Sequence, residues 1–392
     1  MFTMKKTILL FLIFLPFYLF FAQVIKGTVV DESGQRIPNT HIYLDGSKTG
    51  TVSKEDGSFI LNLPSSNTGN IVFQRDDYDT FTAAISELIN KTLKVVLTKT
   101  NAIEEIRLIP YTEEAYKNYI NYFLDTFIGY DKENVKIKNQ RTLKFSFDKK
   151  NKFLKVKAPK TLIIENKTLG YEIQYNLINY SVDFNTSMIN YSGTSFFKET
   201  KNSDKVKLNR MNAFDGSLLH FFRSIYQNKI AEEGFIINKI VKIPNPKYPT
   251  EEELNTVKDF MQMTKKSGTI KIPEDISDIL KRKNKETPYA LALTKSKIPD
   301  ADYTKRNGEQ VLLSFEDMLQ VNYKKYFYES KGKEFIKTTV PVSQSSYLHS
   351  EGETFEISKE GNITNPDLLI NEGDFSKNKI ENMLPLDYQL GD

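Results

Sequence analysis

Apolar and polar residues alternate in short runs over residues 24–97, and turn residues separate the runs. Successive side chains of a strand point to opposite faces, so a period of two predicts strands with one buried face. The first run carries Ile25 and Val29, and the last carries Val95 and Leu97. Several short strands with turns between them predict a small antiparallel all-β unit.

An Asp-Gly pair, Asp56 and Gly57, separates two of these runs. A two-residue hairpin turn needs positive φ at both central residues, which Gly adopts without steric cost, so the pair predicts a tight hairpin. A calcium loop is the alternative. Such a loop needs oxygen ligands at fixed offsets, and Lys54 occupies one of the nearest positions. The sequence therefore favours a chain reversal over a metal site.

The pattern changes after residue 111. Residues 112–129 combine a capping Thr, apolar residues at helical spacing and a terminal Gly, which predicts a helix. A period of two returns over residues 135–198. Within it, the apolar alternation of residues 171–184 changes phase by one residue, which predicts a β-bulge in a long strand.

The rest of the chain mixes both patterns. Apolar spacing predicts helices over residues 215–230, from Thr250 where Glu253 completes a capping box, and near residues 274–283. Strands are expected at residues 311–315, 319–328, 346–349 and 354–357. The predicted fold is an N-terminal all-β sandwich followed by an α+β region with mainly antiparallel strands and several amphipathic helices.

The N-terminal residues 1–22 have the pattern of a secretory signal peptide. Two lysines precede an apolar run from Ile8 to Ala22, which is shorter than the roughly 20 residues of a membrane span and contains Pro16. We expect cleavage after Ala22 and export to the periplasm or the cell surface. An uncleaved N-terminal anchor is the alternative, because Phe20 is bulkier than the cleavage site prefers.

The chain contains no cysteine, which excludes disulfides, thiolate metal ligands and cysteine nucleophiles. Its 392 residues are 39% hydrophobic and 27% charged, as in an ordinary globular protein. The formal charge of +4 falls to +2 without the two leader lysines, so bulk charge predicts no nucleic-acid partner.

A set of glycines, turn residues and apolar positions in residues 27–64 forms a recognisable pattern. Its members are Gly27, Val29, Gly34, Pro38, Ile42, Leu44, Gly50, Thr51, Asp56, Gly57 and Phe59. The pattern resembles the carboxypeptidase-like regulatory domain, a transthyretin-like β-sandwich common in exported Bacteroidetes proteins. One departure is Asp77, where the family usually has Gly before the tyrosine.

The resemblance implies a sandwich over residues 23–98, a linker over 99–111 and an α+β domain of unknown function over 112–392. The whole mature chain is similar in architecture to a group of exported Bacteroidetes proteins that carry this domain. That similarity implies location and architecture, and it transfers no functional residue.

Catalytic signatures are missing from the sequence. A zinc carboxypeptidase needs a His-x-x-Glu pair, and none of His41, His220 and His349 has Glu at that spacing, so we expect no metal site and no cofactor. His220 lies off the apolar stripe of its predicted helix and His41 on the solvent face of a strand, so both are interpreted as surface residues. Nucleophile-elbow, Walker and dinucleotide-binding motifs are also absent. We assign no catalytic residue.

Two pairs of residues are candidates for binding. Lys155 and Lys157 alternate with apolar residues, so a strand places both on the solvent face. There they would bind an anionic glycan, a lipid headgroup or an acidic envelope protein, or simply protect a sheet edge. Tyr171 and Tyr175 share one face of a strand, where they would stack a ligand or lie half-buried in the sheet.

The preferred hypothesis is a non-enzymatic cell-envelope protein with a binding or scaffolding role. The alternative is a secreted hydrolase with a carboxylate-based, glycan-acting site in the second domain. An integral membrane barrel is disfavoured. The strands of a barrel recur at even spacing, whereas amphipathic helices interrupt the predicted strands of this chain.

Overall fold

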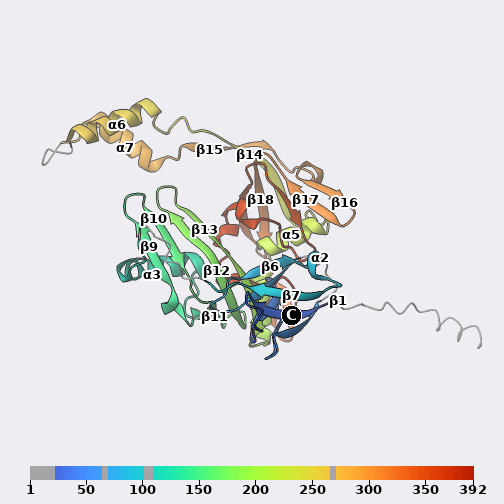
Figure 1. The fold of residues 1–392 in the computed structure, drawn as a ribbon. Helices are drawn as coiled ribbons and strands as arrows, with labels where there is room; N and C mark the ends of the chain where they lie inside the picture. The colour runs from blue at the N-terminus through green and yellow to red at the C-terminus, as the bar shows by residue number, and fades with distance from the viewer. Residues whose placement is uncertain (1–22, 64–68, 101–108, 265–270) are drawn as a thin grey trace, which may run out of the picture. The chain divides into compact units, whose positions relative to one another are not determined.

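The computed structural model describes residues 23–63, 69–100, 109–264 and 271–392 (Figure 1). The predicted leader and most of the predicted linker lie outside these residues. The chain divides into two compact units, the first made of residues 1–123 and 132–202 and the second of residues 124–131 and 203–392. The domain boundaries derived from the sequence stay predictions.

Two sheets form the N-terminal part of the first unit. Their order is β4-β1-β7 and β3-β2-β5-β6. The elements are β1 (Gln23–Asp31), β2 (His41–Leu44), β3 (Gly50–Val52), β4 (Ser58–Leu63), β5 (Asn70–Gln74), β6 (Phe81–Ala84), α2 (Ile85–Leu88) and β7 (Thr92–Leu97). Ile25 and Leu61 of one sheet share a buried apolar cluster with Ile42 and Phe73 of the other. The predicted β-sandwich is therefore confirmed.

The pairing of β7 differs from the sequence prediction. β7 runs parallel to β1, with Val95 beside Val29, because β5, β6 and α2 return the chain to the start of that strand. A Cβ atom on Gly27 would lie 2.3 Å from the carbonyl oxygen of Leu93 in β7, which accounts for glycine at this position. The expectation of a purely antiparallel unit is wrong at this pair.

The Asp56–Gly57 turn reverses the chain, as predicted, but it is not a hairpin within one sheet. It joins β3 to β4, and these strands pair with β2 and β1 in different sheets. Of the two turn residues only Gly57 has positive φ, at 71°. The Asp56 side chain instead accepts a hydrogen bond from the backbone N–H of Ser58 at 2.9 Å. The Asp56 side chain thereby stabilises the turn, and the turn does not need the backbone geometry of a two-residue hairpin.

A second sheet system completes the first unit. Its strands are β8 (Val135–Ile137), β9 (Lys144–Asp148), β10 (Phe153–Lys157), β11 (Leu162–Asn166), β12 (Tyr171–Asp183) and β13 (Met188–Glu199). β12 pairs with β11 and β10 along one edge and with β13 along the other. The register of β12 and β13 shifts between Leu177 and Asn179 and leaves Ile178 66% exposed. The predicted bulge is confirmed.

The predicted helix is α3 (Glu113–Phe127), and Thr112 caps it by accepting a hydrogen bond from the backbone N–H of Ala115 at 3.0 Å. Its aromatic side chains pack on β9 and β12. Phe123 lies 5.8 Å from Phe145 and 4.7 Å from Tyr180 between ring centroids. This aromatic stripe is core, as its helical spacing predicts.

The sandwich contacts the second sheet system through β13. The hydroxyl of Tyr43 lies 3.0 Å from that of Thr194, and the backbone N–H of Gly46 donates to the carbonyl of Ser195 at 2.8 Å. The backbone N–H of Ser195 donates in turn to the carboxylate of Asp45 at 2.8 Å. Polar bonds therefore join the two sheet systems of the first unit.

The second unit contains a five-stranded sheet of order β15-β14-β18-β21-β23, a three-stranded sheet of order β16-β17-β22 and the pair β19-β20. Its strands are β14 (Phe235–Pro244), β15 (Tyr289–Lys295), β16 (Thr304–Asn307), β17 (Gln310–Ser314), β18 (Met318–Lys325), β19 (Tyr328–Lys331), β20 (Glu334–Lys337), β21 (Val342–His349), β22 (Thr354–Ile357) and β23 (Ile370–Gly373). Phe221, Leu313, Leu348 and Phe355 lie in its core. The α+β region with mainly antiparallel strands is confirmed.

The described residues of the second unit include four helices of their own: α4 (Asp204–Phe214), α5 (Leu218–Tyr226), α6 (Glu251–Thr264) and α7 (Glu274–Lys285). Short 3-10 helices lie at Gln140–Thr142 in the first unit and at Asp300–Asp302, Pro366–Leu368, Phe375–Lys377 and Ile380–Asn382 in the second. The predicted capping box is present, since the Thr250 N–H donates to Glu253 at 2.8 Å and the Glu253 N–H to Thr250 at 3.3 Å. Within the described residues, no helix has both the length and the apolar character needed to cross a membrane.

The predicted helix over residues 215–230 is wrong at both ends, because α5 begins at Leu218 and ends at Tyr226. α4 ends at Phe214, Gly216 turns the chain with a φ of 70°, and Ser217 caps α5. A Cβ atom on Gly216 would lie 2.7 Å from the ring of Tyr323, so the turn packs tightly against β18. The break between α4 and α5 places Asp215 in the interior.

Candidate functional site

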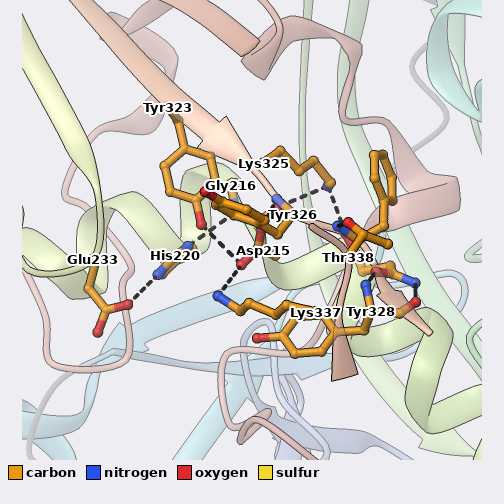
Figure 2. A network of polar contacts seen from close by, with 12 residues as sticks. Asp215, Gly216, His220, Glu233, Tyr323, Lys325, Tyr326, Tyr328, Lys337 and Thr338 are labelled. Atoms are coloured by element: carbon orange, nitrogen blue, oxygen red, sulfur yellow. Dashed lines mark hydrogen bonds and ion pairs between the residues drawn. The ribbon is translucent and has the colours of Figure 1, made fainter. Parts of the chain in front are cut away.

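Asp215 lies at the junction of α4 and α5, is only 3% exposed and is the centre of a polar network (Figure 2). Its Oδ1 accepts a hydrogen bond from the Tyr323 hydroxyl at 3.0 Å and pairs with Lys337 Nζ at 3.5 Å. Its Oδ2 accepts from the backbone N–H of Tyr326 at 3.3 Å. Both carboxylate oxygens are therefore engaged by protein groups.

Lys325 of β18 caps the end of α4. Its ammonium donates to the backbone carbonyls of Asn212 at 2.7 Å and of Asp215 at 2.8 Å. The last carbonyls of a helix have no partner within the helix and carry partial negative charge, so a cation stabilises them. α4 has no basic residue in its own last turn, and β18 supplies one. Burial lowers the pKa of Lys325, and the nearby Asp215 carboxylate opposes that effect.

Asn212 connects the same helix end to β19. Its side-chain oxygen accepts from the backbone N–H of Tyr328 at 2.6 Å, and its amide donates to the Tyr328 carbonyl at 3.1 Å. A side chain that bonds both backbone groups of one residue replaces a strand neighbour. The β19-β20 pair is thereby anchored to α4.

Lys337 of β20 closes the network on its solvent side, with a side chain that is 49% exposed. Its Nζ lies 5.9 Å from the ring centre of Tyr326 and 5.3 Å from that of Tyr328, within cation–π range. Burial opposes the charged form of Lys337, but Asp215 and Tyr328 outweigh it, so the pKa of Lys337 is raised. The residue therefore remains a cation beside Asp215.

His220 lies next to this network on α5. Its Nδ1 accepts from the backbone N–H of Gly216 at 3.1 Å, so Nε2 carries the proton and donates to Glu233 at 3.2 Å. Burial lowers the pKa of His220, although Glu233 and Asp215 oppose the shift. The imidazole is therefore neutral at pH 7, and both of its nitrogens are bonded to protein.

The interpretation of His220 as a surface residue is wrong, because it is only 6% exposed. The rings of Phe214, Phe235 and Tyr323 lie 4.8, 5.0 and 5.7 Å from the imidazole. A prediction from helical spacing assigns only apolar residues to the buried face of a helix. It therefore does not identify a buried histidine whose polar atoms are hydrogen-bonded. A local signal was present in the Asp-Gly-Ser sequence at 215–217, which combines a helix-ending Gly with a capping Ser.

The four residues predicted to bind a ligand lie in the first unit. Lys155 and Lys157 are exposed on β10, as expected, and binding by them stays a prediction. Tyr171 and Tyr175 are 0% and 4% exposed on β12. They offer no ring face to a ligand, so their stacking role is not supported, and their burial is even deeper than the half-buried alternative.

Among the described residues, no group of three or more His, Cys, Asp or Glu side chains is placed to hold a metal ion. The polar network instead contains cations and aromatic hydroxyls around a single buried carboxylate.

Residues 25–107 match the model of the CarboxypepD_reg-like domain family. This match confirms the N-terminal domain that the glycine pattern predicted. Comparison with curated proteins and with solved structures gave no match.

Proposed function

We propose that the chain is a non-catalytic protein of the cell envelope that binds an anionic glycan or an acidic envelope protein through a basic sheet face. The basic face consists of Lys144, Lys155 and Lys157, all exposed on β9 and β10. Lys157 lies directly opposite Lys144 in the antiparallel register. Like charges in that position destabilise a sheet, so an anion bound there relieves their repulsion. This like-charge pair is the observation that carries the proposal.

The basic face lies on the side of the sheet that α3 does not cover, although Ser146, opposite Lys155 on this face, is buried and donates to the carbonyl of Ile109 at 3.0 Å. α3 contacts the side of β9 that bears Phe145 and Phe147, and alternation turns the three lysines to the opposite side. Among the described residues, none of the three lysines forms a salt bridge with an acid. Their charge is therefore available to a partner.

The closed network around Asp215 supports the non-catalytic part of the proposal. A general base needs a free lone pair within hydrogen-bond reach of the substrate. In this structure both oxygens of Asp215 and both ring nitrogens of His220 bond protein groups, and the two residues are only 3% and 6% exposed, so neither is placed to reach a substrate from solvent. The leader-like sequence supports export, and the regulatory-type sandwich supports a role as a module beside a binding domain.

Charge reversal on the basic face tests the proposal. We expect the double variant Lys155→Glu, Lys157→Glu to bind dextran sulfate at least tenfold more weakly than the chain lacking its predicted leader, residues 23–392. The matched control is Lys26→Glu, Lys94→Glu, which makes the same charge change at two exposed lysines of the sandwich. Biosensor titration at low salt measures both. An equal loss in the two double variants would show that only net charge matters and would refute the assigned face.

A further inference from the structure

The strands on either side of α6 and α7 extend beyond the five-stranded sheet. β14 pairs with β18 over residues 235–240 and with β15 over residues 239–244. The two stretches overlap only at Lys239 and Ile240, so the described ladder beyond Ile240 consists of two strands. An isolated two-stranded ladder is marginally stable in water. The end of this ribbon therefore lacks the neighbours that stabilise the rest of the sheet.

This part of the chain exposes an unusual share of apolar side chains. Residues 241–293 hold seven of the 22 exposed large apolar side chains of the described protein: Ile243, Met261, Met263, Ile272, Tyr289, Leu291 and Leu293. The last three lie on β15 and are 58%, 48% and 60% exposed. They occupy alternate positions and so form one apolar row on one face of the strand.

The hydrogen-bonding direction of β15 follows from the end of the ladder. The carbonyl of Pro288 accepts from the backbone N–H of Asn245 at 2.9 Å, so the polar groups of residue 288 face β14. In an antiparallel ladder this direction alternates from residue to residue. Pro244, which has no N–H, lies opposite Tyr289, as expected for a pair that exchanges no hydrogen bonds.

Three residues of β15 therefore direct their backbone groups away from the sheet. These are Tyr289, Leu291 and Leu293, the same residues that form the apolar row. No described strand lies beside this outer edge. The edge offers three N–H donors and three carbonyls, and the Thr287 hydroxyl donates to one of these carbonyls, that of Tyr289, at 2.7 Å. Such an edge is a template for another strand.

We propose that this edge binds the same edge of a second copy of the chain, antiparallel, around a two-fold axis at Leu291. In that register Leu291 faces its counterpart, and Tyr289 faces Leu293 of the second copy. Each residue whose backbone groups face away from β14 then lies opposite a residue of the second copy whose backbone groups also face away from its sheet. The hydrogen-bonded pairs of an antiparallel ladder require this arrangement. The two apolar rows combine on one face, and the contact is the same on both copies, as a closed two-fold dimer requires.

The charge of this edge is compatible with a second copy, and the size of the contact makes the association weak. Residues 288–294 carry no charge, and Lys295 pairs with Asp302 of its own chain at 2.5 Å, so the axis brings no unpaired like charges together. Six apolar side chains and two strand edges bury less than the roughly 1,200 Å² of a standard interface. The dimer is therefore weak and reversible, and it does not depend on the proposed glycan binding.

Sedimentation of residues 23–392 over a range from low micromolar to several hundred micromolar concentration tests the proposal. We expect a monomer–dimer equilibrium that Leu291→Lys weakens at least tenfold. Ile178→Lys is the matched control, since it replaces an apolar residue of the first unit that is more exposed than Leu291, 66% against 48%, and it leaves the equilibrium unchanged. Circular dichroism verifies that both variants are folded. A chain that stays monomeric throughout, or a dimer that Leu291→Lys does not weaken, overturns the proposal.

The register is tested separately, because the chain has no native cysteine. Opposed residues of a hydrogen-bonded pair lie about 5.5 Å apart between Cα atoms. A short bismaleimide therefore links two copies of Leu291→Cys into a covalent dimer, and it links Ile178→Cys at background level only. Equal cross-linking of the two variants overturns the assigned axis.

Discussion

Replacing Asp215 with alanine is expected to lower the free energy of unfolding by about 2–4 kcal/mol. The change leaves the Tyr323 hydroxyl and the Tyr326 N–H without their acceptor and leaves Lys337 without its counter-ion. A buried donor that loses its partner costs about 1–3 kcal/mol, and here two donors are affected. Urea unfolding followed by circular dichroism measures the loss.

Two milder variants separate the contribution of the Asp215 charge from that of a single hydrogen bond to the free energy of unfolding. Asp215→Asn keeps an acceptor oxygen and removes the charge, so we expect a smaller loss than for alanine. Tyr323→Phe removes one hydrogen bond and is expected to cost about 1 kcal/mol. Asp259→Ala, at an exposed position of α6, changes stability by less than about 0.5 kcal/mol. An Asp215→Ala variant as stable as the Asp259→Ala control would contradict the anchoring role.

Asp45→Asn is expected to become more stable relative to the wild type as the pH rises from 4 to 8. Burial raises the pKa of Asp45 from 3.8 to about 6, although the N–H groups of Ser195 and Gly46 oppose the shift. The folded protein therefore holds this proton more tightly than the unfolded chain. Its stabilising contribution is complete below about pH 4 and is lost as the pH rises through about 6.

The size of the change in stability follows from the pKa values of Asp45 in the unfolded and folded states. A shift of about two pH units corresponds to about 3 kcal/mol, and asparagine, which cannot ionise, avoids this loss. Urea unfolding at pH 4, 5, 6, 7 and 8 measures the difference between variant and wild type. Asp56→Asn is the control of opposite sign, because hydrogen bonds with Ser58 lower the pKa of Asp56. A difference between Asp45→Asn and wild type that stays constant with pH would refute the buried-acid interpretation.

Much of the local structure was predictable because it depends on neighbouring residues. The capping box at Thr250 and Glu253, the phase change near Ile178 and the aromatic stripe of α3 are short-range patterns with one physical solution each. The assignment of strands to sheets is not short-range. The turn at Gly57 has the same local chemistry whether its strands pair with each other or with β1 and β2, so the hairpin prediction was wrong.

The Asp215 network was not predictable for the same reason. Tyr323 and Lys337 lie more than a hundred residues from Asp215 in the chain, and no sequence spacing relates them. The break between α4 and α5 was the one local clue, since an interior Asp followed by Gly and Ser ends one helix and begins another. Lys155 and Lys157 were placed correctly because alternation alone decides which face of a strand they occupy.

Hydrolytic turnover by residues 23–392 distinguishes a binding protein from a hydrolase, because Asp215 and His220 are buried and bonded to protein groups, while Glu233, 44% exposed, is the carboxylate of the network that reaches water. Chromogenic glycoside substrates are incubated with the wild type and with Asp215→Asn and Glu233→Gln. We expect no turnover above buffer for any of the three proteins. Turnover by the wild type that is lost in either variant would contradict this expectation and would identify the Asp215 network as a catalytic site.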